Sequence, residues 1–436
     1  MPNNENKNLG YYLKLIGPGL LFAGAAVGVS HLVLATKAGA SYGYSFLWII
    51  LLANVIKYPF FEFAPRYTAA TNKSILYGYK QLGNWVLILF LIVTFFSMFA
   101  IQSAVTIVTA SLLTKFFHLG ANSAVIWSAI LLGLCFLILL LGKYKFLDNI
   151  MKYVIIALTL ASICSVVIAL NKVTDVIEWQ QVVPVDDAGI LLAVMILGWM
   201  PGPIDISVWS SLWTEQKNLS EEEVIDVKTA VFDFNVGYVA TTILALCFLF
   251  LGASIMYKSG IVFSTKGSEF AAQLIDMYTS VLGSWAEPII GIAAITTMFS
   301  TTFTCLDALP RSMSRGTALL LNDSKSYYFL WLIILILGCL VILQYLISEM
   351  GMMIKVATIL SFLAAPFFAI VNHQLIYNRL LSENSASKTR ILDNSIPSGL
   401  KPEHLPPRWI KVLSWFGMIF LTIFSIYYVY FLITNK

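Results

Sequence analysis

The chain has 436 residues, of which 59% are hydrophobic and 11% are charged, whereas soluble globular proteins average roughly 45–50% and about 25%. This composition excludes a soluble domain and predicts an all-α integral membrane protein, because apolar stretches long enough to span a bilayer recur along the whole sequence. The formal net charge of +4 is too small to indicate a nucleic-acid partner, and membrane lipid is the expected surrounding.

Eleven membrane spans are expected, joined mostly by short connections. No polar stretch is long enough to form a separate soluble domain, so residues 1–436 are expected to form one transmembrane domain. The longest polar stretch, at 379–408, is rich in Ser, Asn, Pro and mixed charges and indicates a surface loop. The spans are expected at 12–36, 44–68, 85–113, 121–142, 150–170, 189–213, 229–256, 284–306, 327–348, 352–377 and 409–432.

The distribution of Lys and Arg predicts the orientation of these spans. Most of the 27 Lys and Arg residues fall on the side that holds the N-terminus, and an excess of positive charge marks the cytoplasmic side of a membrane protein. We therefore expect the N-terminus in the cytoplasm and the C-terminus on the opposite side. The expected location is a bacterial cell membrane.

The sixth expected span, 189–213, contains the sequence Leu197-Gly198-Trp199-Met200-Pro201-Gly202-Pro203-Ile204-Asp205. Two prolines around a glycine cannot stay helical, since each proline lacks an N–H and clashes with the preceding turn. In a membrane, the backbone groups that such a break frees are tolerated only where they are buried in protein or line a cavity. Interrupted helices near the bilayer midplane mark the binding sites of transporters, so this stretch predicts a substrate site.

The first expected span has a second weak point at residues 17–31, where several glycines recur. Each glycine lowers helix stability by roughly 1 kcal/mol relative to alanine, and we expect the hydroxyl of Ser30 to cap a restarted half-helix. Interruptions at corresponding positions predict two inverted five-helix repeats, at about 12–170 and 189–377, followed by an extra helix at about 409–432.

Several motifs resemble the Nramp family of divalent-metal transporters. Residues 17–21 and 38–44 are similar to that family's first span, Met200-Pro201 match part of its Met-Pro-His motif, and 299–304 is similar to a Ser/Thr-rich run in its eighth span. The resemblance implies a LeuT-like fold, with two inverted repeats plus an eleventh helix and with helices 1 and 6 interrupted, and transport by alternating access. It further implies that Met200 is a thioether ligand and that Ala25 and Leu197 offer carbonyl oxygens freed by the breaks.

The chain departs from this family at the residues that bind metal. The family's Asp-Pro-Gly-Asn motif falls on residues 28–31, so its metal-binding Asp and Asn are replaced by Gly28 and His31, and Gly202 replaces the histidine of the sixth span. No Asp or Glu lies between residues 63 and 147, so the acidic residues of the family's proton route have no counterpart. Hard divalent cations prefer carboxylate and carbonyl oxygens, so these replacements argue against the family's usual metal chemistry.

Three residues, His31, Met200 and Asp205, remain candidate metal ligands. A histidine within a membrane is functional by default, as a metal ligand, a proton carrier or a donor to an anion, and the alternative is a neutral histidine bonded to a carbonyl. Asp205 is either a ligand or a cap stabilised by the helix dipole, and Met200 is either a ligand or ordinary core filler. The expected substrate site comprises Ala25, Gly28, Ser30, His31, Leu197, Met200, Gly202 and Asp205.

Polar residues in two other spans are candidates for coupling or for the transport pathway. Lys57 is central in the second span and needs a partner; Glu62 is the expected one, in a structural ion pair, and a role in coupling is the alternative. Gln102, Ser103 and Thr106 share one face of the third span, where they either face the pathway or bond helix to helix.

Two transport hypotheses follow. The first is a transporter of a metal cation, with a transition metal favoured because the candidate ligands are soft; the second is a transporter of the same fold for a small neutral or anionic solute, which half-helix N-termini would favour. Coupling to protons and uniport both remain open. An enzyme is not expected, since HExxH, GxSxG and phosphate-loop motifs are absent from the sequence, and no cofactor is predicted.

Overall fold

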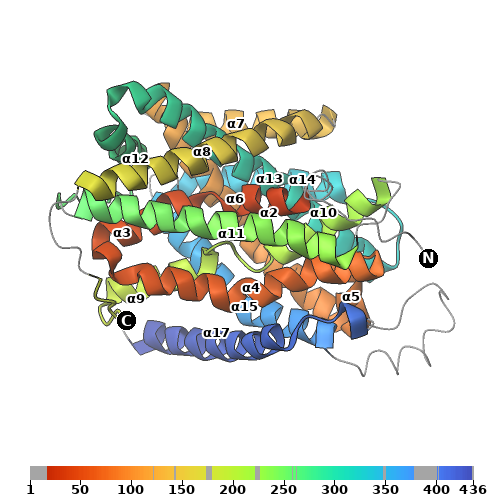
Figure 1. Ribbon diagram of the computed structural model, residues 1–436. Coiled ribbons are helices and arrows are strands. Elements are labelled where there is room, and N and C mark those ends of the chain that lie inside the picture. Colours follow the sequence, from red (N-terminus) through yellow and green to blue (C-terminus); the bar gives the residue numbers. More distant parts are fainter. Residues whose placement is uncertain are drawn as a thin grey trace, which may run out of the picture.

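The computed structural model describes residues 17–120, 122–141, 144–172, 179–220, 226–257, 259–261, 263–346, 350–377, 400 and 402–434, without the side chains of 144–156, 172, 220 and 346. All regular structure in these ranges is helical, and eight helices are long and apolar enough to cross a membrane. The long helices run roughly side by side (Figure 1). The prediction of an all-α membrane protein is confirmed. The expected start of the first span at residue 12 and the polar stretch 379–399 lie outside the described residues.

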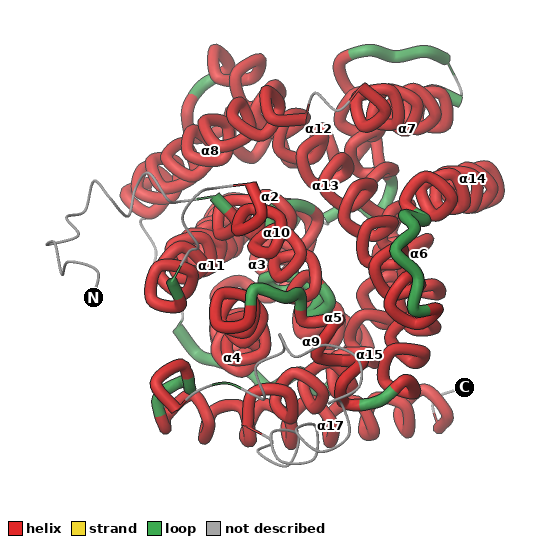
Figure 2. Tube along the Cα trace, turned by 90° about the vertical axis from the view of Figure 1, so that its right-hand side faces the viewer, coloured by secondary structure: helices red, strands yellow, loops and turns green. Residues whose placement is uncertain are grey.

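Long helices form a wall around the interior, and other long helices lie outside it (Figure 2). In the most apolar stretch of three of the outer helices few residues are buried: 22% in α7 and in α14 and 28% in α17, against 67% in the stretch that includes α4. α7, α14 and α17 therefore offer their apolar surface to lipid. The wall comprises α4 (Leu47–Thr71), α6 (Asn84–Phe116), α11 (Val227–Leu251), α13 (Glu287–Leu321) and α15 (Met350–Tyr377). The outer helices are α7 (Ser123–Leu141), α8 (Tyr144–Lys172), α14 (Tyr328–Leu346) and α17 (Arg408–Thr434).

Two interrupted helices lie inside this wall, as predicted (Figure 2). Helix 1 comprises α2 (Pro18–Ala26), a break at residues 27–28, a π-helical turn (Ser30–Ala35) that follows the helical residue Val29, and α3 (Thr36–Tyr42). Helix 6 comprises α9 (Asp187–Trp199), a break at 200–205 and α10 (Ile206–Ser220). Within the described residues helix 1 occupies 18–42, so it continues past its expected end at 36.

The structure differs from the expected spans mainly where the sequence is polar. Two short helices, α5 (Ile75–Leu82) and α12 (Gly267–Leu282), form in stretches that were expected only to connect spans, and each buries one apolar face. α13 continues to Leu321, beyond the expected end at 306, because its second half buries an apolar face that includes Leu309 and Met313. Short turns complete the fold: 3₁₀ turns at Gly43–Phe46, Ser284–Ala286 and Pro402–His404, and a π-helical turn at Gly252–Tyr257.

The first half of helix 1 is held against α11 by close backbone packing. A Cβ on Gly19 would lie 2.0 Å from the Asp233 carbonyl oxygen, and one on Gly237 would lie 2.1 Å from the Gly19 carbonyl oxygen. Small residues allow such close approach of helices within a membrane. The Asp233 carboxylate also accepts hydrogen bonds from the N–H groups of Gly17 and Gly19, at 3.1 and 2.8 Å. α11 therefore caps α2 and fixes its position.

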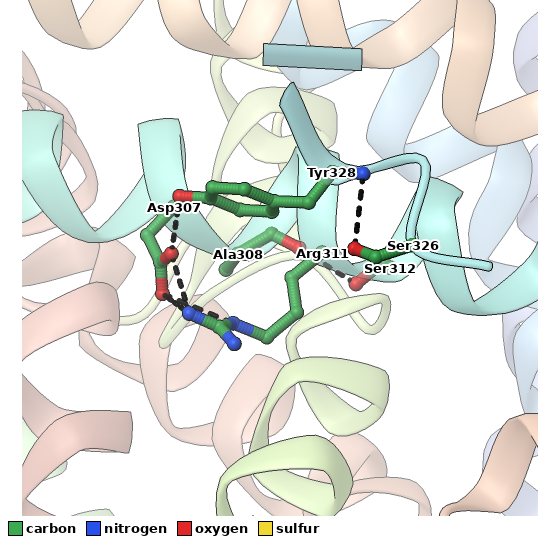
Figure 3. Close-up of polar contacts among 6 residues, drawn as sticks. All are labelled: Asp307, Ala308, Arg311, Ser312, Ser326 and Tyr328. Atoms are coloured by element: carbon green, nitrogen blue, oxygen red, sulfur yellow. Dashed lines mark hydrogen bonds and ion pairs between the residues drawn. The ribbon is translucent and has the colours of Figure 1, made fainter. Parts of the chain in front are cut away.

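Polar contacts tie α13 to α14 on the outer side of the wall (Figure 3). Arg311 donates to both carboxylate oxygens of Asp307, at 2.7 and 2.9 Å, and the Tyr328 hydroxyl donates to Asp307 at 2.7 Å. The Arg311 guanidinium also lies 5.3 Å from the centre of the Tyr328 ring, a cation–π distance. These contacts fix the start of α14 on α13.

Candidate functional site

A cavity lies between the two breaks. The empty space inside it and at its open mouth together measures about 330 Å³. Helix 1, helix 6, α6 and α13 each contribute to its wall. The two helices meet here, since the hydroxyl oxygen of Ser30, just after the break in helix 1, lies 3.4 Å from the Pro201 carbonyl oxygen in the break of helix 6. The lining is mostly apolar and consists of Ala25, Ala26, Gly28, Val29, Ser30, Ile101, Val105, Trp199, Gly202, Pro203, Ile206, Trp209, Thr301 and Cys305.

The break in helix 1 is short and keeps much of its hydrogen bonding. The Val27 N–H still bonds the Ala23 carbonyl at 2.8 Å, and the helix restarts with the Leu32 N–H bonded to the Gly28 carbonyl at 3.0 Å. Across from the break, the Thr301 hydroxyl of α13 lies 2.9 Å from the Val27 carbonyl oxygen. A neutral hydroxyl from the wall therefore braces this break.

Thr301 also occupies the space beside Gly28. A Cβ on Gly28 would lie 2.8 Å from Thr301 Cγ2 and 2.9 Å from Thr301 Oγ1, which is closer than side chains pack. A carboxylate side chain at residue 28 is therefore excluded unless Thr301 moves.

Both ring nitrogens of His31 have protein partners. Nε2 lies 3.0 Å from the Thr241 carbonyl oxygen of α11 and therefore donates to it, which leaves Nδ1 as an acceptor 2.8 Å from the Ser30 hydroxyl. The ring is completely buried and does not contribute to the cavity wall. The Ser30 hydroxyl lies 2.8 Å from the Ala26 carbonyl oxygen and caps no helix, so the prediction that Ser30 caps the restarted half-helix is wrong.

The break in helix 6 frees more backbone than the break in helix 1. In a continuous helix the carbonyls of Leu197 and Trp199 would accept from residues 201 and 203, but both are prolines and have no N–H. The Lys57 ammonium of α4 reaches this break and donates to the carbonyls of Gly198 and Gly202, at 3.2 and 2.7 Å. Backbone carbonyls are common partners of buried cations in membranes.

The expected ion pair between Lys57 and Glu62 is wrong. Glu62 is bonded to Arg66, one turn further along α4. Asp205, directly before α10, is instead the charged group that acts on Lys57 electrostatically, without an ion-pair contact between these two described residues. Asp205 is 5% exposed, and its Oδ1 atom has no hydrogen-bond partner among the described residues.

Only some of the other residues of the predicted substrate site belong to the cavity wall. Ala25, Gly28, Ser30 and Gly202 line it, whereas Leu197, Met200 and Asp205 are buried in helix 6 outside its wall. The part of the chain that the structure describes contains no cluster of three or more His, Cys, Asp and Glu residues suited to a metal ion.

The polar face of the third expected span joins α6 to α13. The Gln102 amide donates to the Thr302 carbonyl and to the Thr106 hydroxyl, both at 3.2 Å, while Ser103 is completely buried. None of the three lines the cavity, although Ile101 and Val105 of the same helix do.

Sequence reasoning missed several residues of the cavity wall. Thr301 belongs to the Ser/Thr-rich run, which indicated a functional helix but not which hydroxyl faces the breaks. Trp209 and Cys305 carry no sequence signal, because any apolar residue is ordinary at those positions of a membrane helix.

Comparisons with known proteins identify the family. The model of the family "Natural resistance-associated macrophage protein-like", or Nramp, matches residues 19–391. The chain belongs to the Nramp family. Members of this family are transporters and not enzymes, so this chain is a transporter of the Nramp type and an integral membrane protein.

Among its relatives, the uncharacterized protein PM0681 of Pasteurella multocida is 34% identical over 421 residues, covering 95% of this chain and 91% of that protein. The divalent metal cation transporter MntH of Staphylococcus aureus is 22% identical over 450 residues, covering 98% of this chain and 92% of MntH. The family resemblance predicted from the motifs is confirmed.

Solved structures show the same fold. A mutant of the manganese transporter of Eremococcus coleocola superposes with a TM-score of 0.73 at 15% identity and covers 98% of this chain and 87% of its own. Mhp1, a nucleobase-cation-symport-1 family transporter, superposes with a TM-score of 0.56 at 14% identity, over 95% of this chain and 92% of its own. The prediction of a LeuT-like fold with helices 1 and 6 interrupted is confirmed.

Proposed function

We propose that this Nramp-type transporter works by alternating access and carries a small neutral or anionic solute through the cavity between the breaks of helices 1 and 6. The observation that carries this proposal is the chemistry of the cavity wall. None of the described residues that line it bears a carboxylate, and Thr301 fills the space where a side chain on Gly28 would project. A hard divalent cation would find no charged oxygen there.

The electrostatics of helix 6 support a neutral or negative substrate. Gly202, Pro203 and Ile206 line the cavity at the N-terminal end of α10, where the helix dipole is positive. The Lys57 ammonium adds a positive charge directly behind Gly202, to whose carbonyl it donates. On the opposite side, Ala25 and Ala26 end α2, and the last carbonyls of a helix are acceptors. The matching solute carries an acceptor or anionic group at one end and a hydrogen-bond donor at the other.

Transport of a metal cation is the second candidate, because MntH and the Eremococcus coleocola protein carry metal-transporter names. In that case His31, Met200 and Asp205 would supply the ligands, with the carbonyls of Ala25 and Leu197. The observation that favours it is the buried Asp205 Oδ1 atom, which has no hydrogen-bond partner among the described residues. Both nitrogens of His31 would first have to leave their present partners.

The proposal extends to topology and coupling. We place the N-terminus in the cytoplasm of a bacterial cell and the C-terminus on the other side of its membrane, with inverted repeats at about 12–170 and 189–377 and an extra helix at about 409–432. Coupling to protons would involve the polar groups Lys57, Gln102, Ser103 and Thr106, of which only Lys57 contacts a break.

Purified protein in liposomes tests the choice between the two substrates. Uptake of Mn²⁺, Fe²⁺, Zn²⁺ and Mg²⁺ is measured with an internal metal indicator, beside uptake of a panel of radiolabelled small carboxylates and amides. We expect saturable uptake of a member of the panel that none of the four cations inhibits. Saturable uptake of any of the four cations would overturn the proposal in favour of the second candidate. Repeating the successful assay with and without a pH gradient tests proton coupling.

A further inference from the structure

Lys57 is a charged side chain that is fully buried and reaches the break of helix 6. It is 0% exposed and lies near the middle of α4. A charge at this depth costs several kcal/mol unless it is neutralised, so its partners show what it does. Lys57 is not part of the cavity wall, so it would not contact the solute directly.

The two partners of the Lys57 ammonium lie on either side of the place where helix 6 unwinds. Gly198 is in the last turn of α9, and Gly202 is in the break itself. The C-terminal end of a half-helix carries a partial negative charge, and in interrupted membrane helices such ends and unwound carbonyls are where small cations bind. The Lys57 nitrogen therefore occupies the position of a coordinated cation.

Asp205 is an acidic group close to this position, although it makes no ion-pair contact with Lys57. It interacts electrostatically with Lys57, is buried, and keeps one carboxylate oxygen without a hydrogen-bond partner in the described part of the chain. Two carbonyls and one carboxylate are the oxygen ligands that hard cations take. With Lys57 present, its ammonium fills the position between the two carbonyls.

Resting on the proposed function, in which the substrate is not a metal, we propose that the Lys57 ammonium is a tethered cation that fills an oxygen site in the break of helix 6 and thereby excludes free cations from it. Lys57 is then a specificity-determining residue of the transporter. Removal of its side chain converts the break into a vacant site with a net negative charge, which a hard cation can enter.

Lys80 offers a matched control. Its ammonium likewise donates to oxygens at the C-terminal end of a helix, the Leu319 carbonyl and the Asn322 side chain. Leu319 lies 14 residues after Cys305 along α13, or about 21 Å from the cavity wall at 1.5 Å per residue. Lys80→Ala therefore removes the same kind of contact without opening the break of helix 6.

The test is Mn²⁺ binding to the purified full-length protein, measured by isothermal titration calorimetry and by the shift in melting temperature. We expect no response from the wild type or from Lys80→Ala, and saturable binding by Lys57→Ala. Adding Asp205→Asn to Lys57→Ala should weaken that binding by at least about tenfold, because even residues that only orient metal ligands account for 10–100-fold in affinity. Propylammonium, which replaces the lost group, should compete with Mn²⁺ in Lys57→Ala.

The outcomes separate this inference from the proposed function. If folded Lys57→Ala ignores Mn²⁺ as the wild type does, the tethered-cation inference is wrong and the proposed substrate class stands. If the wild type itself binds Mn²⁺, the substrate class is wrong, and the inference stands only if Lys57→Ala binds more tightly. Lys57→Ser, whose hydroxyl can still donate to one carbonyl, repeats the test where the alanine variant does not fold.

Discussion

The two helix breaks of this transporter both leave backbone carbonyls unpaired, and different side chains bind those carbonyls in each break. The break in helix 1 contains no proline, and hydrogen bonds continue close to both of its edges. The break in helix 6 contains Pro201 and Pro203, which remove two N–H groups from its backbone. A hydroxyl, that of Thr301, braces the first break, and a charge, that of Lys57, braces the second.

The number of hydrogen bonds that the bracing side chain can donate corresponds to the number of carbonyls that the break leaves unpaired. An unpaired carbonyl in the membrane interior costs about 1–3 kcal/mol, and one hydroxyl offers a single hydrogen, which suits the short break in helix 1. The longer break in helix 6 presents carbonyls on both sides, and an ammonium with three hydrogens bonds Gly198 and Gly202 together. A charged side chain, that of Lys57, is therefore buried beside the break that the two prolines create in helix 6.

The largest effect is expected at the charged brace. Lys57→Met should lower the free energy of unfolding by about 3–5 kcal/mol, because it leaves Asp205 buried without its counter-charge. Adding Asp205→Asn should restore part of this loss, since it removes the buried acidic group that Lys57 no longer offsets electrostatically. Unfolding in detergent by a denaturant series measures both, with Lys80→Met as the control for loss of a lysine. If the loss in the double variant equals the sum of the losses in Lys57→Met and in Asp205→Asn alone, the two charges act independently.

A smaller loss is expected where Thr301 crowds helix 1. Gly28→Ala should destabilise the protein by about 1–3 kcal/mol, because its Cβ overlaps the Thr301 side chain. Thr301→Ala in the same chain removes the overlapping atoms and should recover most of the loss. Melting temperatures of the single and double variants decide this.

Gly133→Ala is the control for this prediction. No atom lies within 4 Å of the Cβ that would be added to Gly133 in α7, so that change should be neutral or slightly stabilising, as alanine is in a helix. If Gly28→Ala were equally harmless, the space beside residue 28 would be open, and the argument against a carboxylate there would fail.

The same contrast explains how far the sequence alone could go. Both breaks could be predicted, because Pro-Gly-Pro and repeated glycines act on the backbone locally. Lys57 could be recognised as needing a partner, but the nearby Glu62 was the wrong choice, since Glu62 is taken by Arg66 and the true partners lie 141 and 145 residues away. Thr301 beside Gly28, and the second half of α13, likewise depend on which distant helices meet, and composition does not encode that.

The N-terminal caps of α2 and α9, which are the first halves of helices 1 and 6, give a third test. α2 is capped by Asp233 from α11, whereas α9 is capped by Asp186, which directly precedes it and accepts from the Gly189 N–H at 3.0 Å. Asp233→Ala should cost about 2 kcal/mol, since it removes two hydrogen bonds to a buried carboxylate, and Asp186→Ala about 1 kcal/mol, as for an ordinary N-cap. Denaturant unfolding compares the two variants, and a larger cost for Asp186→Ala would contradict the order.

The cap at Asp186 also responds to pH. Asp186 lies outside the spanning segments, and the Gly189 N–H and the Tyr42 hydroxyl hold the pKa of its carboxyl below the usual 3.8. Its stabilising contribution is therefore present above pH 3.8 and is lost as the pH falls further through the lowered pKa. Asp186→Asn should remove this dependence and leave the rest of the acid unfolding curve unchanged.

The smallest effect on stability is expected at the hydroxyl brace itself. Thr301→Val keeps the shape of the side chain and removes one hydrogen bond, so it should cost only about 0.6–1 kcal/mol. Thr109→Val is the matched control, because the Thr109 hydroxyl also bonds carbonyls of α6 and α13 but contacts neither break. The two variants should be equally stable in denaturant unfolding. They should differ in transport, with the KM for the solute raised several-fold in Thr301→Val alone, because Thr301 lines the cavity and holds the Val27 carbonyl. An unchanged KM in Thr301→Val would mean that the short break in helix 1 keeps its geometry without a brace, so that only the break opened by proline depends on the wall.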